Sequence, residues 1–292
     1  MVKLRWIVFV AIAICGCAQP RLSPKFSVAL ILTDATPNKM WDQGGYEGLA
    51  MVKQQLGCDV LTVACRTSEE RQKTTQELLD NGYKLVLHFG ASEAGSTSGK
   101  VIAVGADRGV RLVSDEAFYL AGLAAKSVSK SGRIGFVSRN PTGANVLAVK
   151  KAVGAANVLV MAPESEFDVA SSAAVQRAIA GGADVILQDL LTGYQGVFES
   201  CEGNGILAMG YFANQNEDSP AILGSVVVTP GRAFLDIATN VKEGKPGGRA
   251  EYRFKDGVSS FVINPDQRYR VPDPVLARLV ELEKGFMAGK PY

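Results

Sequence analysis

Short apolar runs alternate with helical patterns along the first hundred residues. Four of these runs have the length and apolar content of a buried strand: KFSVALIL (25–32), DVLTV (59–63), KLVLHF (84–89) and VIAV (101–104). The segments between them favour helices over 41–56 and 69–81, and a weaker helical pattern precedes the fourth run. Such alternation predicts a parallel sheet that helices cover on both faces.

A helix over 116–129 comes next, and Ser114, Asp115 and Glu116 supply its cap and first-turn acids. A second series of the same kind begins with the strand at 133–138. Strands and helices then alternate again: strands at 133–138, 158–162, 184–188 and 206–211, and helices over 143–153, 169–180 and 193–201. Segments 76–87 and 176–187 share one layout, and two further pairs of segments match at similar offsets. These matches predict two similar lobes.

The pattern changes after Tyr211. The remaining segments predict a strand at 221–228, a helix over 230–243, a hairpin built from 250–254 and 258–263 around Asp256-Gly257, and a last amphipathic helix over 274–287. Late elements of this kind suit crossings between lobes. We therefore expect the following division: lobe 1 from 26–114 and 230–264, and lobe 2 from 115–229 and 265–292.

The composition excludes several classes of protein. The chain has 292 residues, of which 47% are hydrophobic and 21% charged, so it is not disordered and is long enough for two lobes. It carries 31 basic and 29 acidic residues, and without Lys3 and Arg5 the charges balance, which argues against nucleic-acid binding. Its one histidine, His88, excludes sites that need several imidazoles, and neither a metal nor a cofactor is predicted.

Residues 1–17 have the layout of a signal peptide. Lys3 and Arg5 precede an apolar run over 6–15, which is shorter than the roughly 20 residues of a membrane-spanning helix. The run ends Ile14-Cys15-Gly16-Cys17, which resembles a bacterial lipobox and predicts a lipid anchor on Cys17, with 18–25 as a tether. The protein is then expected on the cell membrane, facing the periplasm or the exterior. The alternatives are an ordinary secretory signal and a retained anchor.

Three cysteines, Cys58, Cys65 and Cys201, belong to the predicted lobes. Cys58 and Cys65 flank a predicted strand that would hold them ~23 Å apart, so they cannot form a disulfide with each other. One bridge to Cys201 stays open as an alternative, but burial of all three as free thiols is the favoured interpretation.

Ligands of doubly wound sheets bind outside the carboxyl ends of the strands. If two such lobes face each other, the loops at 34–43, 88–93, 138–143, 188–194 and 211–216 line one cleft. Their aromatic rings, carboxylates and amides suit a flat polar ligand. The candidate ligand-binding residues are Asp34, Asn38, Trp41, Asp42, His88, Phe89, Asn140, Tyr194, Phe212 and Asn214, and the same loops carry Arg139, Gln188, Asp189 and Thr192.

Each candidate also has a purely structural interpretation. Trp41 could pack helix 41–56 on its sheet, and Asp42 could be a first-turn acid of that helix. His88 could be a satisfied, half-buried strand residue instead of a ligand contact or a general base. Neither a G-x-G-x-x-G after the first strand nor a G-x-x-x-x-G-K-[ST] occurs, so these nucleotide-binding motifs are absent from the sequence.

Segment 34–49, DATPNKMWDQGGYEGL, resembles the opening motif of the basic membrane protein family, substrate-binding lipoproteins of ABC importers. Four further segments are similar to family motifs in matching order: EAFYLAGLAA (116–125), GRIGFV (132–137), GADVI (182–186) and TGYQGVF (192–198). In this resemblance Trp41 falls on a Phe that stacks on a purine base, and Asp42 on an Asn that hydrogen-bonds the base.

The chain departs from the family pattern at the sugar end. Phe212 stands where nucleoside-binding members have an Asp that binds the ribose hydroxyls, and Ser225-Val226-Val227-Val228 lacks the expected Lys. Gly105 stands where an acid is expected, with Asp107 two places on. The resemblance therefore implies a ligand that is planar and polar at one end and more apolar or smaller at the other, such as a purine nucleoside, a nucleobase or another aromatic metabolite.

The resemblance implies the type I periplasmic-binding-protein fold, which consists of two doubly wound, Rossmann-like α/β lobes joined by a hinge. The implied function is capture of a small solute for an ABC permease, by a monomer that performs no enzymatic reaction and closes about hinge segments near 114–116, 228–230 and 264–266. Three alternatives stay open: a ligand-sensing regulatory lipoprotein that signals to a membrane partner, an enzyme that uses His88 with a cleft carboxylate, and a surface adhesin.

Overall fold

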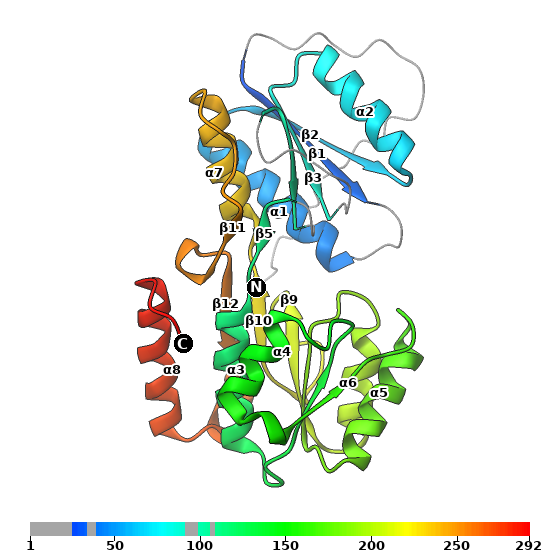
Figure 1. Cartoon of the computed structure of the whole chain (residues 1–292), viewed down its shortest axis with the longest axis vertical. Helices are drawn as coiled ribbons and strands as arrows, with labels where there is room; N and C mark the ends of the chain where they lie inside the picture. Colours follow the sequence, from blue (N-terminus) through cyan, green and yellow to red (C-terminus); the bar gives the residue numbers. More distant parts are fainter. Residues whose placement is uncertain (1–24, 34–38, 91–98, 106–108) are drawn as a thin grey trace, which may run out of the picture.

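A computed structural model describes residues 25–33, 39–90, 99–105 and 109–292. Two lobes stand one above the other and are joined by a narrow waist (Figure 1). Each lobe is built around its own sheet, so the α/β fold class with two doubly wound lobes is confirmed.

Lobe 1 contains a four-stranded parallel sheet in the order β2-β1-β3-β4. Its strands are β1 (Ser27–Thr33), β2 (Asp59–Cys65), β3 (Leu85–Phe89) and β4 (Val101–Val104), and its helices are α1 (Lys39–Leu56), α2 (Ser68–Asp80) and α7 (Pro230–Lys242). α1 and α7 pack together over one face, and α2 covers the other. α2 begins with a capping box in which the Thr67 hydroxyl accepts a hydrogen bond from the Glu70 N–H at 3.1 Å.

Lobe 2 contains a six-stranded sheet in the order β12-β10-β9-β8-β6-β7, parallel except for β12. Its strands are β6 (Ile134–Val137), β7 (Val158–Met161), β8 (Val185–Gln188), β9 (Leu207–Phe212), β10 (Ile222–Val228) and β12 (Ser259–Ile263). Its helices are α3 (Asp115–Val128), α4 (Ala144–Val153), α5 (Asp168–Ala180), α6 (Tyr194–Gly203) and α8 (Asp273–Met287), with 3₁₀ turns η1 (Ala155–Asn157), η2 (Phe254–Asp256) and η3 (Pro265–Arg270). α3, α4 and α8 cover one face and α5 and α6 the other.

Three chain segments cross between the lobes. The first follows β5 (Arg111–Leu112) into α3, the second runs from β10 into α7, and the third follows β11 (Glu251–Tyr252) into η2. β5 and β11 pair with each other as a two-stranded parallel ribbon at the waist. The hinge segments expected near 114–116 and 228–230 lie at the first two of these crossings.

The structure corrects the third crossing. The expected hairpin does not form, because β11 pairs with β5 while β12 pairs with β10 in the sheet of lobe 2. Between them the chain makes a 3₁₀ turn that ends at Gly257 in the left-handed region. The chain therefore returns to lobe 2 near residue 253, not near 264–266. The apolar alternation of 258–263 fitted either partner strand, so the sequence alone did not distinguish the two pairings.

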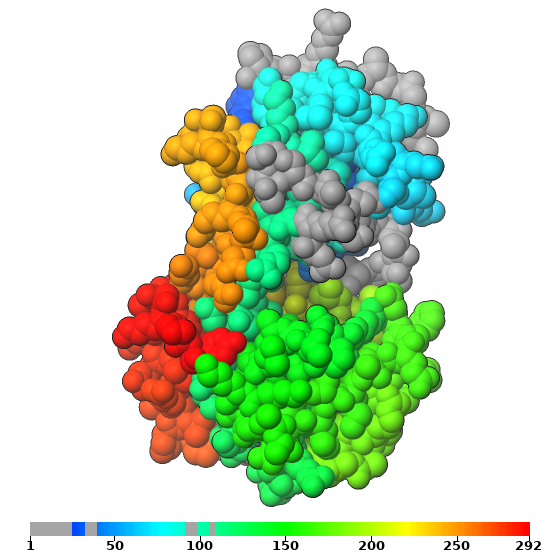
Figure 2. Space-filling view, viewed as in Figure 1, coloured from blue at the N-terminus to red at the C-terminus, as the bar shows by residue number. Residues whose placement is uncertain are grey.

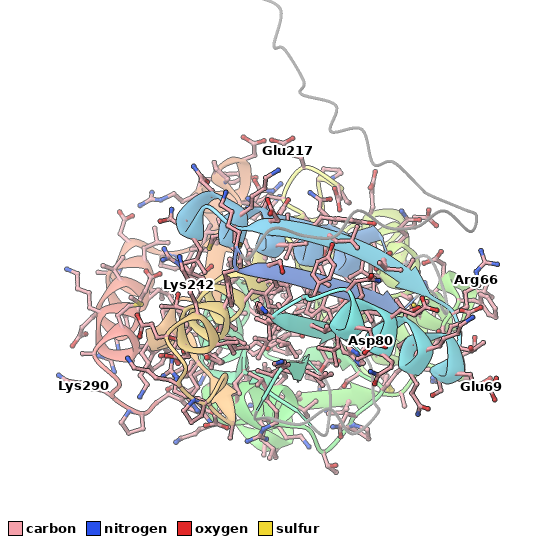
Figure 3. The ribbon with its side chains drawn as sticks, turned by 90° about the horizontal axis from the view of Figure 1, so that it is seen from above. Arg66, Glu69, Asp80, Glu217, Lys242 and Lys290 are labelled. Carbon is pink, nitrogen blue, oxygen red and sulfur yellow. The ribbon has the colours of Figure 1, made fainter. Side chains whose placement is uncertain are left out.

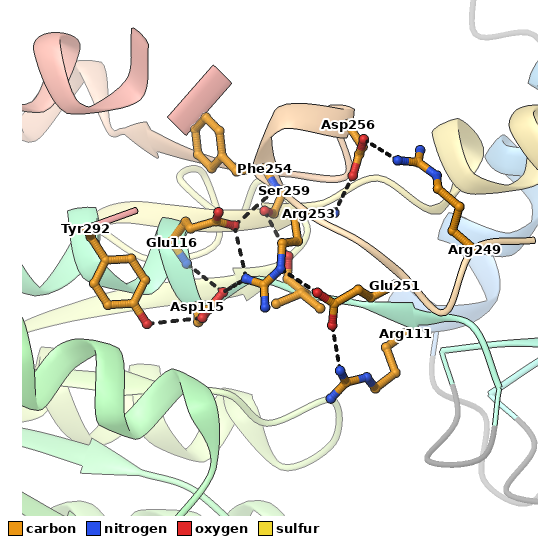
Figure 4. Close-up of polar contacts among 11 residues, drawn as sticks. Arg111, Asp115, Glu116, Arg249, Glu251, Arg253, Phe254, Asp256, Ser259 and Tyr292 are labelled. Carbon is orange, nitrogen blue, oxygen red and sulfur yellow. Dashed lines mark hydrogen bonds and ion pairs between the residues drawn. The ribbon is translucent and has the colours of Figure 1, made fainter. Parts of the chain in front are cut away.

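A chain of charged groups lies beside this third crossing (Figure 4). Arg253 donates to Asp115 at 3.2 Å and to Glu251 at 2.7 Å, and Glu251 also pairs with Arg111. Asp115 and Glu116 are only 8% exposed. Burial raises the pKa of Glu116, because desolvation disfavours its charge more than the Phe254 N–H and Arg253 favour it. These contacts connect the first turn of α3 to both strands of the waist.

Charged side chains of both signs lie at the outside of the molecule. Seen from above, Arg66 and Glu69 of lobe 1 project from its outline, as do Glu217 and Lys290 of lobe 2 (Figure 3). In the space-filling view the two lobes are separate masses joined by the segments of the waist (Figure 2). Cys58, Cys65 and Cys201 are free and buried, so the favoured interpretation of the cysteines is confirmed.

Candidate ligand-binding site

A cavity of about 340 Å³ lies between the lobes, at the carboxyl ends of strands from both sheets. Lobe 1 contributes Trp41 and Gly105, the crossing segments contribute Leu112, Ser114 and Val228, and lobe 2 contributes Asn140, Asn145, Asp189, Tyr211 and Phe212. A larger hollow of about 840 Å³ lies on lobe 2 around 214–220 and 262–267, away from this sheet edge. We take the interlobe cavity as the candidate site because it combines both sheet edges, where doubly wound folds bind ligands.

Trp41 forms the wall of the cavity on lobe 1. The residue lies in the first turn of α1, and its indole stacks on Phe89 with ring centroids 4.1 Å apart and 10° between the ring planes. Phe89 in turn packs edge-on against Phe234 of α7 at 5.2 Å. A continuous stack of rings therefore runs from the core of lobe 1 to the cavity.

Two glycines make room for the indole. Gly90 and Gly105 follow β3 and β4 and both have φ near +77°, a conformation that suits glycine. A Cβ on Gly90 would lie 2.4 Å from Nε1 of Trp41, and a Cβ on Gly105 would lie 2.6 Å from its Cη2. Trp41 and Gly105 therefore depend on each other, because the indole of Trp41 occupies space that a side chain at 105 would need.

Phe212 joins the two lobes. The residue ends β9 in the sheet of lobe 2, yet its ring packs in the hydrophobic core of lobe 1 and lies 4.9 Å from the Trp41 ring at 35°. The side chain is 2% exposed, and its φ of +74° makes it the only residue other than glycine with a positive φ in the described part of the chain. Left-handed backbone at a bulky residue is strained, and such strain persists only where the surroundings hold it.

The wall on lobe 2 is polar. Asp189 follows β8 and accepts a hydrogen bond from Nδ2 of Asn145 at 3.3 Å, and Oδ1 of Asn145 accepts one from Ser114 at 3.2 Å. Burial raises the pKa of Asp189 to about 6, against the opposing effects of Ser138, Asn145 and Arg139. The Tyr211 phenol lies nearby, and its pKa is raised by burial and then by the Asp189 carboxylate.

Of the ten expected residues, Trp41, Asn140 and Phe212 line this cavity. His88 does not, because alternate residues of a strand face opposite sides of the sheet. Its ring points toward α2, where Nε2 lies 2.9 Å from the Thr75 hydroxyl. Phe89 faces the other side but is completely buried behind Trp41. The structure therefore places both away from the cavity surface.

Three more of the expected residues lie outside the cavity lining. Asp42 is half-buried in the first turn of α1, Tyr194 begins α6 and packs against Phe198, and Asn214 is exposed beside the larger hollow of lobe 2. Asp34, Asn38, Asp107 and Cys17 lie outside the residues that the structure describes.

The polar lining residues that were not candidates include Asn145, Asp189, Tyr211 and Ser114. Asp189 had the clearest signal, because it is a carboxylate directly after a buried strand. Ser114 was considered only as a helix cap, although its hydroxyl turns to Asn145 and makes no cap bond. Asn145 lies one position inside α4, where sequence gives no sign that its side chain faces the cleft.

Within the described ranges, no group of His, Cys, Asp and Glu side chains is arranged to hold a metal ion. No helix among the described residues is both long enough and apolar enough to cross a membrane.

Solved structures with the same arrangement of lobes show what the fold is. The chain is similar to a transcriptional activator of the comK gene from Bacillus halodurans, with 20% identity, a TM-score of 0.78 and coverage of 89% of this chain and 97% of that one. It is also similar to an ABC transporter solute-binding protein from Aeropyrum pernix K1, with 12% identity, a TM-score of 0.69 and coverage of 90% and 92%. The chain has the type I periplasmic-binding-protein fold.

The same architecture also occurs in regulators. The Escherichia coli transcriptional repressor ascG matches with 11% identity and a TM-score of 0.59, over 82% of this chain and 98% of that one. No protein-family model matches the chain, and no curated protein matches it either. The resemblance to the basic membrane protein family therefore stays a prediction, whereas the fold that it implied is confirmed.

Proposed function

We propose that this protein captures a small solute between its two lobes and delivers it to the permease of an ABC importer. The proposal depends mainly on the cavity of about 340 Å³ that both lobes line, at the sheet edges where this fold can bind a ligand. Solute-binding proteins of ABC transporters are among the structures that share the fold.

The proposal places the protein outside the cytoplasm. The basic and apolar pattern of residues 1–17 supports a signal peptide, and the lipobox-like end supports a lipid on Cys17 that holds the mature protein on the membrane. The tether at 18–25 would let the lobes stand free of that membrane. Growth of cells with labelled palmitate tests this step, and a Cys17→Ala variant should lose the label.

The first solutes to test are purine nucleosides, nucleobases and other flat aromatic metabolites. Trp41 supports this choice, because an aromatic wall favours a flat apolar surface, and the polar groups of lobe 2 can bind donors on the same solute. Phe212 in the place of a ribose-binding Asp favours a nucleobase or a smaller aromatic metabolite over a nucleoside.

A thermal-shift screen tests solute capture. The two lobes are built from residues 25–292, so the soluble form that begins at Ala18 keeps both of them. The panel contains purine and pyrimidine bases, nucleosides, aromatic amines, alcohols and acids, sugars and amino acids. A solute that binds only the native state stabilises it by about 2.7 kcal/mol at 100 times its Kd. The proposal fails if no solute raises the Tm.

A ligand-sensing lipoprotein is the second candidate function. The observation in its favour is that a transcriptional activator and a repressor share this fold. The two functions make different predictions for a deletion of the gene, because loss of an importer component abolishes uptake of the labelled solute. Loss of a sensor leaves uptake intact and changes the transcriptional response to the solute.

We further propose that the cleft binds its solute without turnover. His88, the expected general base of an enzyme, bonds to Thr75 on the far face of the sheet, so its present position supports no acid–base role in the cavity. A His88→Ala variant should keep the solute affinity of the wild type. Release of a changed product by the wild type, and not by this variant, would restore the enzymatic alternative.

A further inference from the structure

The polar wall of the cavity contains a carboxylate whose charge the protein compensates only in part. Asp189 is half-buried, and its desolvation exceeds the combined effect of its hydrogen bonds from Ser138 and Asn145. The bond from Asn145 is long, at 3.3 Å. A carboxylate has room for about four hydrogen bonds, so these partners leave acceptor capacity on the cavity side.

The nearby cations are already engaged elsewhere. Arg139 donates to Glu166 at 2.8 Å and to Thr192 at 2.9 Å, and Arg111 pairs with Glu251. No ion pair to Asp189 within 4.0 Å occurs among the residues that the structure describes. Each neighbouring arginine therefore forms its close ion pair with another carboxylate, and Arg139 compensates the charge of Asp189 only in part, from a distance.

The opposite wall is mostly apolar, although Arg111, which pairs with Glu251, also lines the cavity. Trp41, Leu112 and Val228 present apolar surface from lobe 1 and the crossing segments, and Phe212 completes that side. A solute in this cavity meets rings and aliphatic groups at one end and a carboxylate at the other. The hydrophobic effect favours burial of an apolar part of the solute at the first end. At the second end the buried carboxylate favours a solute group that donates a hydrogen bond to it.

We propose that Asp189 is the residue that selects the solute, and that the solute carries a donor group, an ammonium in preference to a neutral N–H or O–H, on a flat apolar body that lies against Trp41. This inference rests on the proposed function and narrows its ligand class. It excludes solutes that present an anionic group to lobe 2, because a carboxylate there would meet Asp189.

The proposal implies a dependence of affinity on pH. The groups that face Asp189 are Ser138 and Arg139 after β6, Asn145 on α4 and Tyr211 on β9. Burial raises the pKa of the Tyr211 phenol, so this group stays neutral in the acid range. Asp189 alone then titrates, so the affinity for an ammonium solute should fall as the pH falls through about 6.

Three matched probes test the selection: phenethylamine, 2-phenylethanol and phenylacetate share a ring and differ only in the end group. Calorimetry with the form that begins at Ala18 should show the amine as the tightest, the alcohol next and the acid weakest. An acid that binds as well as the amine would overturn the proposal. So would a failure of all three probes while a solute without any donor binds from the broad panel.

Asp189→Asn separates selection from a structural role. We expect this variant to lose about tenfold or more in affinity for the amine and only a few-fold for the alcohol, because a charge-assisted bond is lost. It should also lose the pH dependence, while its own Tm at neutral pH rises. Asp266→Asn, the same charge change on an exposed residue of lobe 2, should leave every affinity unchanged.

The outcomes distinguish the two proposals. If no solute of the broad panel binds, the proposed function fails. If a panel solute binds but none of the three probes does, the affinity of that solute for the Asp189→Asn variant decides whether Asp189 selects it. An affinity equal to that of the wild type overturns the proposal about Asp189 and leaves the proposed function standing. The same conclusion follows if the variant loses affinity equally for all solutes and its Tm is lowered.

Discussion

The two lobes have the same kind of architecture and opposite surfaces toward the cavity. Lobe 1 presents an indole that rests on Phe89 and on two glycines, so its wall is apolar and filled from behind. Lobe 2 presents Tyr211 and the pair of Asp189 and Asn145, which share a hydrogen bond. Asn145 also accepts a hydrogen bond from Ser114 at the start of α3. One doubly wound layout therefore supports a packed aromatic wall in one copy and a polar wall in the other.

This difference indicates how the lobes divide the work of recognition. The aromatic wall owes its shape to packing, so changes there should alter stability and affinity together. The polar wall contains Asp189, whose burial as a charged group costs stability. A change at this residue should therefore raise stability while it lowers affinity for the solute. Phe212 belongs to both lobes, because its strand lies in one and its ring in the core of the other.

The largest effect is expected from Phe212→Ala, which removes the ring that connects the lobes. Loss of a buried Phe should lower the free energy of unfolding by about 3–5 kcal/mol. Phe212→Gly removes the same ring but relieves the left-handed backbone, so it should be more stable than Phe212→Ala by about 1 kcal/mol. Urea unfolding of both variants measures the difference. A less stable Gly variant would show that the backbone at 212 is not strained.

The next effect is expected from Gly90→Ala on lobe 1. The new methyl would meet the indole and would also adopt a positive φ, so we expect a loss of about 3 kcal/mol. Gly82→Ala is the matched control, because its φ is +91° and nothing lies within 4 Å of the new Cβ. It should lose only about 1 kcal/mol. Equal losses in the two variants would mean that Trp41 does not rest on Gly90.

Arg253→Met tests the charged chain at the waist. The substitution leaves Asp115 and Glu116 without their cation, and we expect a loss of about 2 kcal/mol, reduced because the arginine side chain is 34% exposed. Arg278→Met, which breaks only an exposed pair with Glu281, should cost about 0.5 kcal/mol or less. Chemical unfolding of both variants provides the comparison, and equal effects would place Arg253 among ordinary surface charges.

The smallest effect, and the one of opposite sign, is expected for the unliganded protein with Asp189→Asn. Because folding raises the pKa of Asp189 to about 6, its contribution to stability is fully present below about pH 4 and is lost as the pH rises through 6. The variant lacks this loss, so at pH 7 it should be more stable by about 1–2 kcal/mol, with allowance for solvent access. At about pH 4 the difference should vanish. Destabilisation at pH 7 would show that Asp189 serves the fold.

The sequence predicted the sheets well because buried parallel strands are continuous apolar runs. The runs at 27–33, 85–89 and 185–188 are strands in the structure, and most helix ends fall within a residue or two of the expected positions. The partner of 258–263 was beyond such reasoning. Pairing across a waist depends on where three distant segments meet, and apolar alternation is the same for either partner.

The site was predictable at the level of loops, and less so at the level of side chains. The carboxyl-end rule pointed to the segments that contain Trp41, Asn140 and Phe212. The rule could not show that His88 faces α2. That prediction also requires knowledge of which alternate residues of the strand face each side of the sheet. Nor could the rule show that the ring of Phe212 crosses into the other lobe, because that depends on a backbone angle that the residue type disfavours.

Trp41 offers the most direct test of solute capture between the lobes. The chain has two tryptophans, Trp6 and Trp41, so the form that begins at Ala18 contains Trp41 alone. We would titrate this form with the panel solute that raises the Tm most, and follow the tryptophan emission. The account predicts a saturable change in emission with the same Kd as calorimetry gives. Binding that saturates by calorimetry and leaves the emission of Trp41 unchanged would contradict it.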